Sequence, residues 1–94
     1  MDLSVNYNIA KTRDEAFALA KSEITPEYVA KFNVKADISY DEAKGIMEAK
    51  GKGFTLTLDF DDSKCEVSLK LSFLLRALKG KILGKIENKL QKHV

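Results

Sequence analysis

Two alternating runs near the middle of the chain constrain the fold most. They are "FTLTLDF" (54–60) and "CEVSLKLSF" (65–73), and only "DDSK" separates them. In each run the apolar side chains take every second position, which is typical of a strand with one buried face. Asp and Ser favour tight turns because their side chains bond to nearby backbone groups. The runs therefore predict an antiparallel hairpin whose apolar face, including Phe73, must be covered.

Helical patterns precede this hairpin and follow it. "LSVNYNI" (3–9) alternates like a strand, and a capping box, Thr12 with Glu15, then predicts a helix over 12–24. Thr25 before Pro26 predicts a second, short helix start. Alternation returns at 34–40 and, more weakly, at 46–50. We therefore expect one α+β domain, 1–94, of order β-α-α-β-β-β-β-α. Its antiparallel sheet of four to five strands would be covered by the N-terminal helical region and a long C-terminal helix.

Composition restricts the function. The chain has 94 residues, 45% apolar and 32% charged, with a net charge of only +2. We therefore expect a soluble cytoplasmic protein with no membrane span and no nucleic-acid partner. Cys65 and His93 are the sole cysteine and histidine. They cannot build a metal cluster of these ligands, and neither has the neighbours of a nucleophile or base. We expect a protein that is not an enzyme and needs no metal or cofactor.

The C-terminal helix carries an unusual charge pattern. Residues 73–94 hold six basic side chains and one acidic, a net charge of +5, whereas residues 1–72 hold ten basic and thirteen acidic, a net charge of −3. Two parallel ridges run along the helix with a step of four residues. The apolar ridge is Leu78, Ile82, Ile86 and Leu90, and the basic ridge is Lys81, Lys85 and Lys89. Two interpretations stay open: the helix packs on its own sheet with lysines at the rim, or it binds an external apolar or anionic surface.

Gly80 and Gly84 lie in the same helix. An interior helical glycine costs about 1 kcal/mol relative to alanine. Either the pair packs closely against another backbone, or it marks a bend that separates the two halves of the helix.

The segment "GKGFTLTLDFDDSKCEVSLKLSFLLRALKGKILGKIENKL", with "YNIAKTRDEAFALA" earlier in the chain, resembles the bacterial family of polyhydroxyalkanoic acid system (granule-region) proteins. The chain departs from the family at Ser72, where a glycine is common. The resemblance covers nearly the whole chain and implies association with bacterial polyester storage granules, or a link to that system. It supplies no catalytic residues. The order of elements is also similar to small helix-grip, lipid-binding folds, a likeness of fold alone.

Three hypotheses follow. The leading one is a non-enzymatic accessory protein that binds a granule or another apolar surface through the two ridges of the C-terminal helix. The second is a carrier of a small hydrophobic ligand, held in a cavity lined by Phe54, Leu56, Leu69, Leu71 and Leu78. The third is a protein-interaction module or homo-oligomer that uses a sheet edge or the terminal helix.

Overall fold

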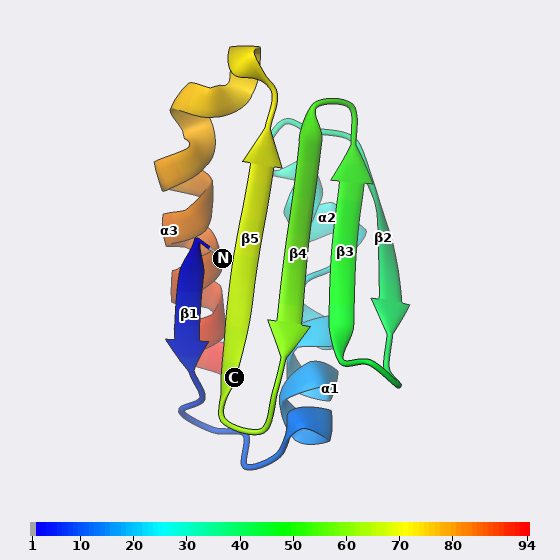
Figure 1. The fold of residues 1–94 in the computed structure, drawn as a ribbon, viewed down its shortest axis with the longest axis vertical. Coiled ribbons are helices and arrows are strands. Elements are labelled where there is room, and N and C mark those ends of the chain that lie inside the picture. The colour runs from blue at the N-terminus through cyan, green and yellow to red at the C-terminus, as the bar shows by residue number, and fades with distance from the viewer. Residues whose placement is uncertain (1) are drawn as a thin grey trace.

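The structure is a computed structural model that describes residues 2–94. Five antiparallel strands form one sheet in the order β1-β5-β4-β3-β2, and all helices lie on one face of it (Figure 1). The elements are β1 (Leu3–Asn6), α1 (Arg13–Glu23), α2 (Pro26–Ala30), β2 (Ala36–Asp41), β3 (Ile46–Gly51), β4 (Phe54–Phe60), β5 (Lys64–Leu71), the 3-10 helix η1 (Phe73–Leu78) and α3 (Lys79–His93). The predicted α+β class and order are confirmed, and η1 is an addition.

The predicted hairpin is the centre of the sheet. β4 and β5 pair antiparallel from Phe54 opposite Leu71 to Phe60 opposite Cys65. The Asp61 carboxylate accepts hydrogen bonds from the backbone amides of Ser63, at 2.8 Å, and Lys64, at 2.7 Å. These bonds hold the turn and lower the pKa of Asp61 below its usual value. The acidic run therefore serves as turn chemistry, as the sequence indicates.

The two N-terminal helices begin where their caps predict. The Thr12 hydroxyl accepts from the Glu15 amide at 3.1 Å, and the Thr25 hydroxyl accepts from the Tyr28 amide at 3.2 Å. Each bond satisfies an amide that has no partner inside the helix. α1 and α2 lie over the β4-β3-β2 side of the sheet, whereas α3 lies over β1 and β5 (Figure 1).

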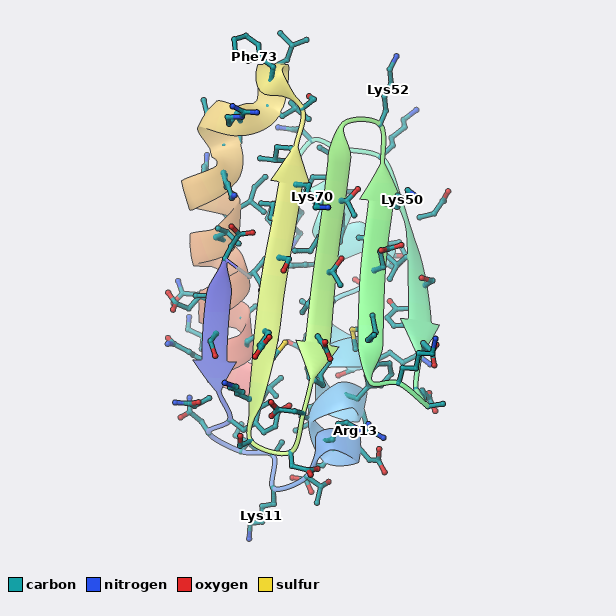
Figure 2. All side chains as sticks on the ribbon, in the orientation of Figure 1. Lys11, Arg13, Lys50, Lys52, Lys70 and Phe73 are labelled. Carbon is teal, nitrogen blue, oxygen red and sulfur yellow. The ribbon has the colours of Figure 1, made fainter. Side chains whose placement is uncertain are left out.

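One hydrophobic core lies between the sheet and the helices. Its strand residues alternate with polar ones, so the inner face is apolar. The buried set is Val5, Ala10, Ala16, Phe17, Ala20, Ile24, Val29, Phe32, Met47, Ala49, Phe54, Leu56, Leu58, Phe60, Cys65, Val67, Leu69, Ile82, Ile86, Leu90 and Val94. The opposite face of the sheet is open to solvent and carries mainly polar side chains, Lys50 and Lys70 among them (Figure 2).

Two predicted inward positions are wrong. β5 ends at Leu71, and Phe73 begins η1 with 83% of its surface exposed. At the other end β1 stops at Asn6, so that Ile9 is 52% exposed. There the backbone amides of Ile9 and Ala10 both donate to the carbonyl of Val94. The chain leaves the strand in both places, and alternation beyond a strand's end no longer fixes which side chains are buried.

The two helical glycines face solvent. α3 is a continuous helix from Lys79 to His93, and among residues 2–94 a Cβ at Gly80 or Gly84 would meet no atom within 4 Å beyond its immediate helical surroundings. Close packing of the two glycines against another backbone segment of the described chain is therefore wrong. Nor does the α-helix break at either glycine: the change of helix type falls earlier, where η1 passes into α3 at Leu78.

Candidate functional site

The apolar ridge of α3 mostly belongs to the core. Ile82, Ile86 and Leu90 are 3%, 0% and 1% exposed. The structure thus decides between the two open interpretations for these residues: they pack on the protein's own sheet and offer nothing to an external surface. Only Leu78, 38% exposed, keeps part of its surface in solvent. Of the four residues of this ridge, only Leu78 could therefore make the predicted apolar contact.

A different apolar surface lies at the end of the molecule. Phe73 is 83% and Leu74 is 88% exposed, the highest values among the large hydrophobic residues that are exposed. Both lie on the first turn of η1, which projects beyond the strands at one end of the long axis (Figures 1 and 2). We call these two residues the apolar tip. Its side chains gain almost nothing from the protein's own core, which makes the pair a candidate contact site.

Several basic side chains lie toward the same end of the molecule as the apolar tip (Figure 2). The Ser72 amide donates to the Gly53 carbonyl at 2.8 Å, which fixes the β3–β4 turn beside the start of η1. Lys52 lies in that turn and projects outward at the same end as Phe73 (Figure 2). Arg76, also exposed, follows on η1. Lys50 and Lys70 flank Thr55 in one row of the sheet, and Asp37, opposite Lys50, is the acidic member of that row.

A positively charged surface lies between α2 and α3. It is an open groove of about 330 Å³ lined by Tyr28, Lys31, Phe32, Lys85, Asn88, Lys89, Lys92 and His93. A smaller hollow of about 70 Å³, lined by Lys31, Lys81 and Lys85 among others, shares two of those lysines and reaches Leu78. We call the two together the basic groove. They include the whole predicted basic ridge, Lys81, Lys85 and Lys89, so the structure keeps these lysines on one surface while it buries the apolar ridge.

Aromatic side chains form part of the wall of the basic groove. The Tyr28 and Phe32 rings pack edge to face with centroids 5.3 Å apart, and the Lys89 ammonium lies 5.0 Å from the Tyr28 centroid. The Tyr28 hydroxyl donates to the Lys85 carbonyl at 3.2 Å. Burial raises the pKa of Tyr28 above its usual value, so the hydroxyl remains a neutral donor. Tyr28 therefore joins α2 to α3 and gives the groove a fixed shape.

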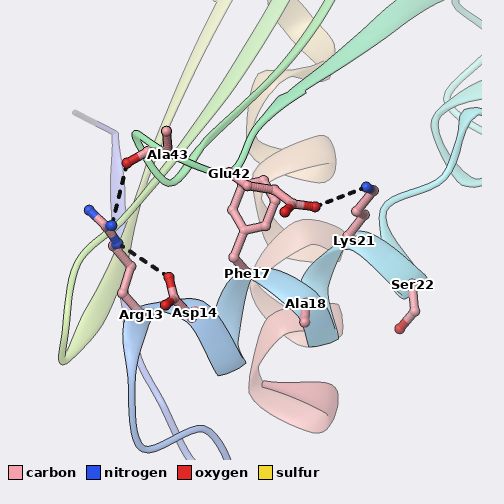
Figure 3. Close-up of a pocket in the computed structure, with 8 residues that line it drawn as sticks. All are labelled: Arg13, Asp14, Phe17, Ala18, Lys21, Ser22, Glu42 and Ala43. Atoms are coloured by element: carbon pink, nitrogen blue, oxygen red, sulfur yellow. Dashed lines mark hydrogen bonds and ion pairs between the residues drawn. The ribbon is translucent and has the colours of Figure 1, made fainter.

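A third groove lies where α1 meets the β2–β3 turn. It measures about 750 Å³, with Phe17 and Ala18 between charged side chains (Figure 3). Its cations already have partners: the Arg13 Nη2 donates to the Ala43 carbonyl at 3.4 Å, and Lys21 lies 3.3 Å from Glu42. These charges largely neutralise one another, so this groove lacks the excess of one sign found between α2 and α3.

The predicted ligand cavity corresponds to packed core. Phe54, Leu56 and Leu69 are at most 1% exposed and belong to one hydrophobic cluster, with Leu71 packed at its edge. None of the three grooves described above is lined by Phe54, Leu56 or Leu69. Leu78 lines the small hollow instead. The structure therefore does not bring the five predicted cavity residues around a common space.

The Cys65 thiol lies in the core, and the His93 imidazole lies next to a carboxylate. Cys65 is 1% exposed on β5, and burial raises the pKa of its thiol, which disfavours the reactive thiolate. His93 Nε2 lies 3.2 Å from the Glu23 carboxylate. Within residues 2–94 no three His, Cys, Asp or Glu side chains converge as metal ligands. No helix in the same range is long and apolar enough to cross a bilayer.

Comparison with known proteins yields a family. No curated protein and no solved structure matches the chain. The family model described as "Putative polyhydroxyalkanoic acid system protein" matches residues 4–94. This range includes every strand and helix except the first residue of β1. The chain therefore belongs to the family of polyhydroxyalkanoic acid system proteins.

Proposed function

We propose that the protein is a non-enzymatic accessory protein of the bacterial cytoplasm that associates with polyhydroxyalkanoate storage granules through its apolar tip. The observation that carries the proposal is the exposure of Phe73 and Leu74, 83% and 88%, in a chain of this family. The granule would still contact an apolar and basic surface, as the sequence predicts. The apolar contact would come from η1 and not from Ile82, Ile86 and Leu90, which are buried.

The energetics of the apolar tip support a surface role. Burying a Phe or Leu side chain fully yields about 1.5–3 kcal/mol, so that the pair could contribute roughly 3–6 kcal/mol on a polyester surface. This is an upper range, because association also costs translational and rotational freedom. Lys52, at the same end of the molecule, and Arg76, on η1, could each add about 1 kcal/mol where the surface carries negative charge. A compact tip of two residues thus fits reversible attachment.

The surroundings of the potentially reactive groups support a non-enzymatic role. The Cys65 thiol is enclosed in the core with a raised pKa. His93 is engaged by Glu23 at the end of α3. The groove with the largest volume among those described is bordered by Arg13 and Lys21, which are held in polar contacts with neighbouring groups. None of these groups is arranged as a nucleophile beside a base.

Co-sedimentation with polyhydroxybutyrate particles tests the proposal. The variant carries Phe73→Ser and Leu74→Ser together, which removes the apolar tip without touching the core. We expect the bound fraction at a fixed particle area to fall at least five-fold. Ile9→Ser is the matched control, since Ile9 is also an exposed large apolar residue, 52%, but belongs to the segment after β1. It should bind like the parent chain.

The outcome that contradicts the proposal is equally defined. If the double variant binds particles as well as the parent and the Ile9 control, the apolar tip does not mediate attachment. Urea unfolding of each variant separates loss of binding from loss of fold, because serine at two exposed positions should change the free energy of unfolding by less than about 1 kcal/mol.

A further inference from the structure

The basic groove holds a linear array of cations from two helices. Lys81, Lys85, Lys89 and Lys92 follow one another on α3, and Lys31 faces them from the end of α2. With a rise of about 1.5 Å per residue, the lysines of α3 span roughly 16 Å along the helix axis. Within the described part of the chain, Lys31, Lys81, Lys85 and Lys92 form no ion pair. The groove therefore has an excess of unneutralised positive charge along one line.

One carboxylate of the chain already pairs with cations at one end of the basic groove. Glu23, at the end of α1, lies 3.7 Å from the Lys89 ammonium and 3.2 Å from His93 Nε2. This carboxylate neutralises only the end of the groove near the C-terminus. The acidic side chains of α2 and α3 themselves do not line the groove: Glu27 lies in the first turn of α2, and Glu87 lies on α3. Most of the array remains available to an external anion.

The spacing of the lysines fits an extended peptide. Successive members of the ridge Lys81, Lys85 and Lys89 lie about 6 Å apart along the helix. Alternate residues of an extended strand lie about 6.6 Å apart on the same side. Carboxylates on alternate residues could therefore meet Lys81 and Lys85, and the length of the array, roughly 16 Å, corresponds to about five extended residues. A single phosphate would reach only part of an array of this length.

The aromatic side chains argue against a nucleic acid in this groove. Proteins that bind single strands stack bases on exposed aromatic rings. Here Phe32 is 7% exposed, its ring packs against Tyr28, and Lys89 occupies a position over the Tyr28 ring. No arginine lines the groove, so the bidentate recognition that favours phosphate groups is missing as well.

We propose that the basic groove between α2 and α3 binds an extended acidic segment of a partner protein, with carboxylates two residues apart paired to Lys81 and Lys85 and a further carboxylate paired to Lys92, about 10 Å farther along α3. This site is independent of the apolar tip and does not depend on the granule proposal. The expected complex is weak and sensitive to salt, because exposed ion pairs each contribute at most about 1 kcal/mol and are screened by salt.

Fluorescence anisotropy with a labelled peptide of alternating Glu and Ser, twelve residues long, tests the site on the full chain. The groove variant is Lys85→Glu with Lys92→Glu, and we expect it to weaken binding at least ten-fold at low salt. The matched control is Lys50→Glu with Lys70→Glu, which changes the net charge equally but lies on the open face of the sheet (Figure 2). It should stay within two-fold of the parent.

Two results would overturn the proposal. Equal weakening by the control variant would show attraction to overall charge and not to the groove. Tighter binding of an oligothymidylate of equal charge than of the peptide would assign the groove to nucleic acid.

Lys85→Gln with Lys92→Gln guards against a folding defect, since it removes charge without reversing it and should still weaken peptide binding at least three-fold. Groove variants should also retain binding to polyester particles, which separates this test from that of the apolar tip.

Discussion

Replacing Gly84 by alanine should stabilise the protein. Gly84 lies inside α3, on its solvent side, and an added Cβ would meet no atom of the described residues within 4 Å beyond the local helix. Glycine in a helix interior costs about 1 kcal/mol relative to alanine, chiefly because it loses more backbone freedom on folding. With nothing to collide with, Gly84→Ala should recover about that amount. Gly80, the second residue of α3, lies in the first turn and should give less.

Urea unfolding followed by circular dichroism measures the effect. With a denaturant slope of about 1 kcal/mol per molar urea, at the lower end for small domains, the Gly84→Ala midpoint should rise by roughly 1 M. The melting temperature should rise by about 4–8 °C, the shift expected per kcal/mol for a domain of this size. Gly51→Ala is the control, because a Cβ there would collide with the Lys35 carbonyl oxygen. That variant should be destabilised.

A lower midpoint for Gly84→Ala would refute the reasoning. It would mean that the face of α3 bearing Gly84 is in close contact with another backbone, as the G-x-x-x-G spacing allows. If the loss appeared only at high protein concentration, where a dimer forms, the contact would be with a second copy of the chain. An unchanged midpoint, with Gly51→Ala destabilised, would show that the helix is already frayed at this position.

Two further predictions concern the core and the response to acid. Ile86→Ala, at a site with 0% exposure, should lower the free energy of unfolding by about 2–5 kcal/mol. Leu74→Ala at the apolar tip should change it by less than about 0.5 kcal/mol. Similar losses for the two variants in urea unfolding would contradict the placement of η1. The Asp2 carboxylate accepts from the Leu69 amide at 2.8 Å and pairs with Lys79 at 2.9 Å, and both contacts lower its pKa below 3.8. Its contribution is therefore present above pH 3.8 and lost as pH falls through the lower folded value. Asp2→Asn should be less stable than the parent at neutral pH and should lose less stability on acidification to about pH 2, and identical pH profiles would exclude the contact.

The sheet and the first two helices follow from local signals. Alternation at 54–60 and 65–71, the Asp61 turn and the Thr12 and Thr25 caps are each decided within a few residues, and the structure confirms them. The order of strands is less local, but short connections make neighbours of β2 through β5, and β1 then takes the free edge beside β5.

The apolar tip could not be read from periodicity. Phe73 continues the alternation of β5, and Leu78 continues the ridge of α3, so that each pattern assigns its residue to the core. Phe73 and Leu78 both lie in η1, the 3-10 helix between β5 and α3, where neither the strand period nor the α-helix period applies. A usable signal was the run "SFLLRAL", which places Phe73 and Leu74 next to each other where strand and helix periods conflict. Local conflict of this kind is expected at functional sites.

The positions of the two proposed surfaces make them compatible. The apolar tip lies at one end of the long axis, and α3 runs from that end down the side of the sheet (Figure 1). A surface that contacts Phe73 and Leu74 end-on would leave most of the basic groove, which follows α3 toward His93, open to the surroundings. Under the two proposals, the lysines toward the C-terminal end of α3 would therefore contact the peptide and not the granule. Lys92 lies near the C-terminal end of α3, far along the chain from η1, so Lys92→Glu should weaken peptide binding and leave particle binding unchanged.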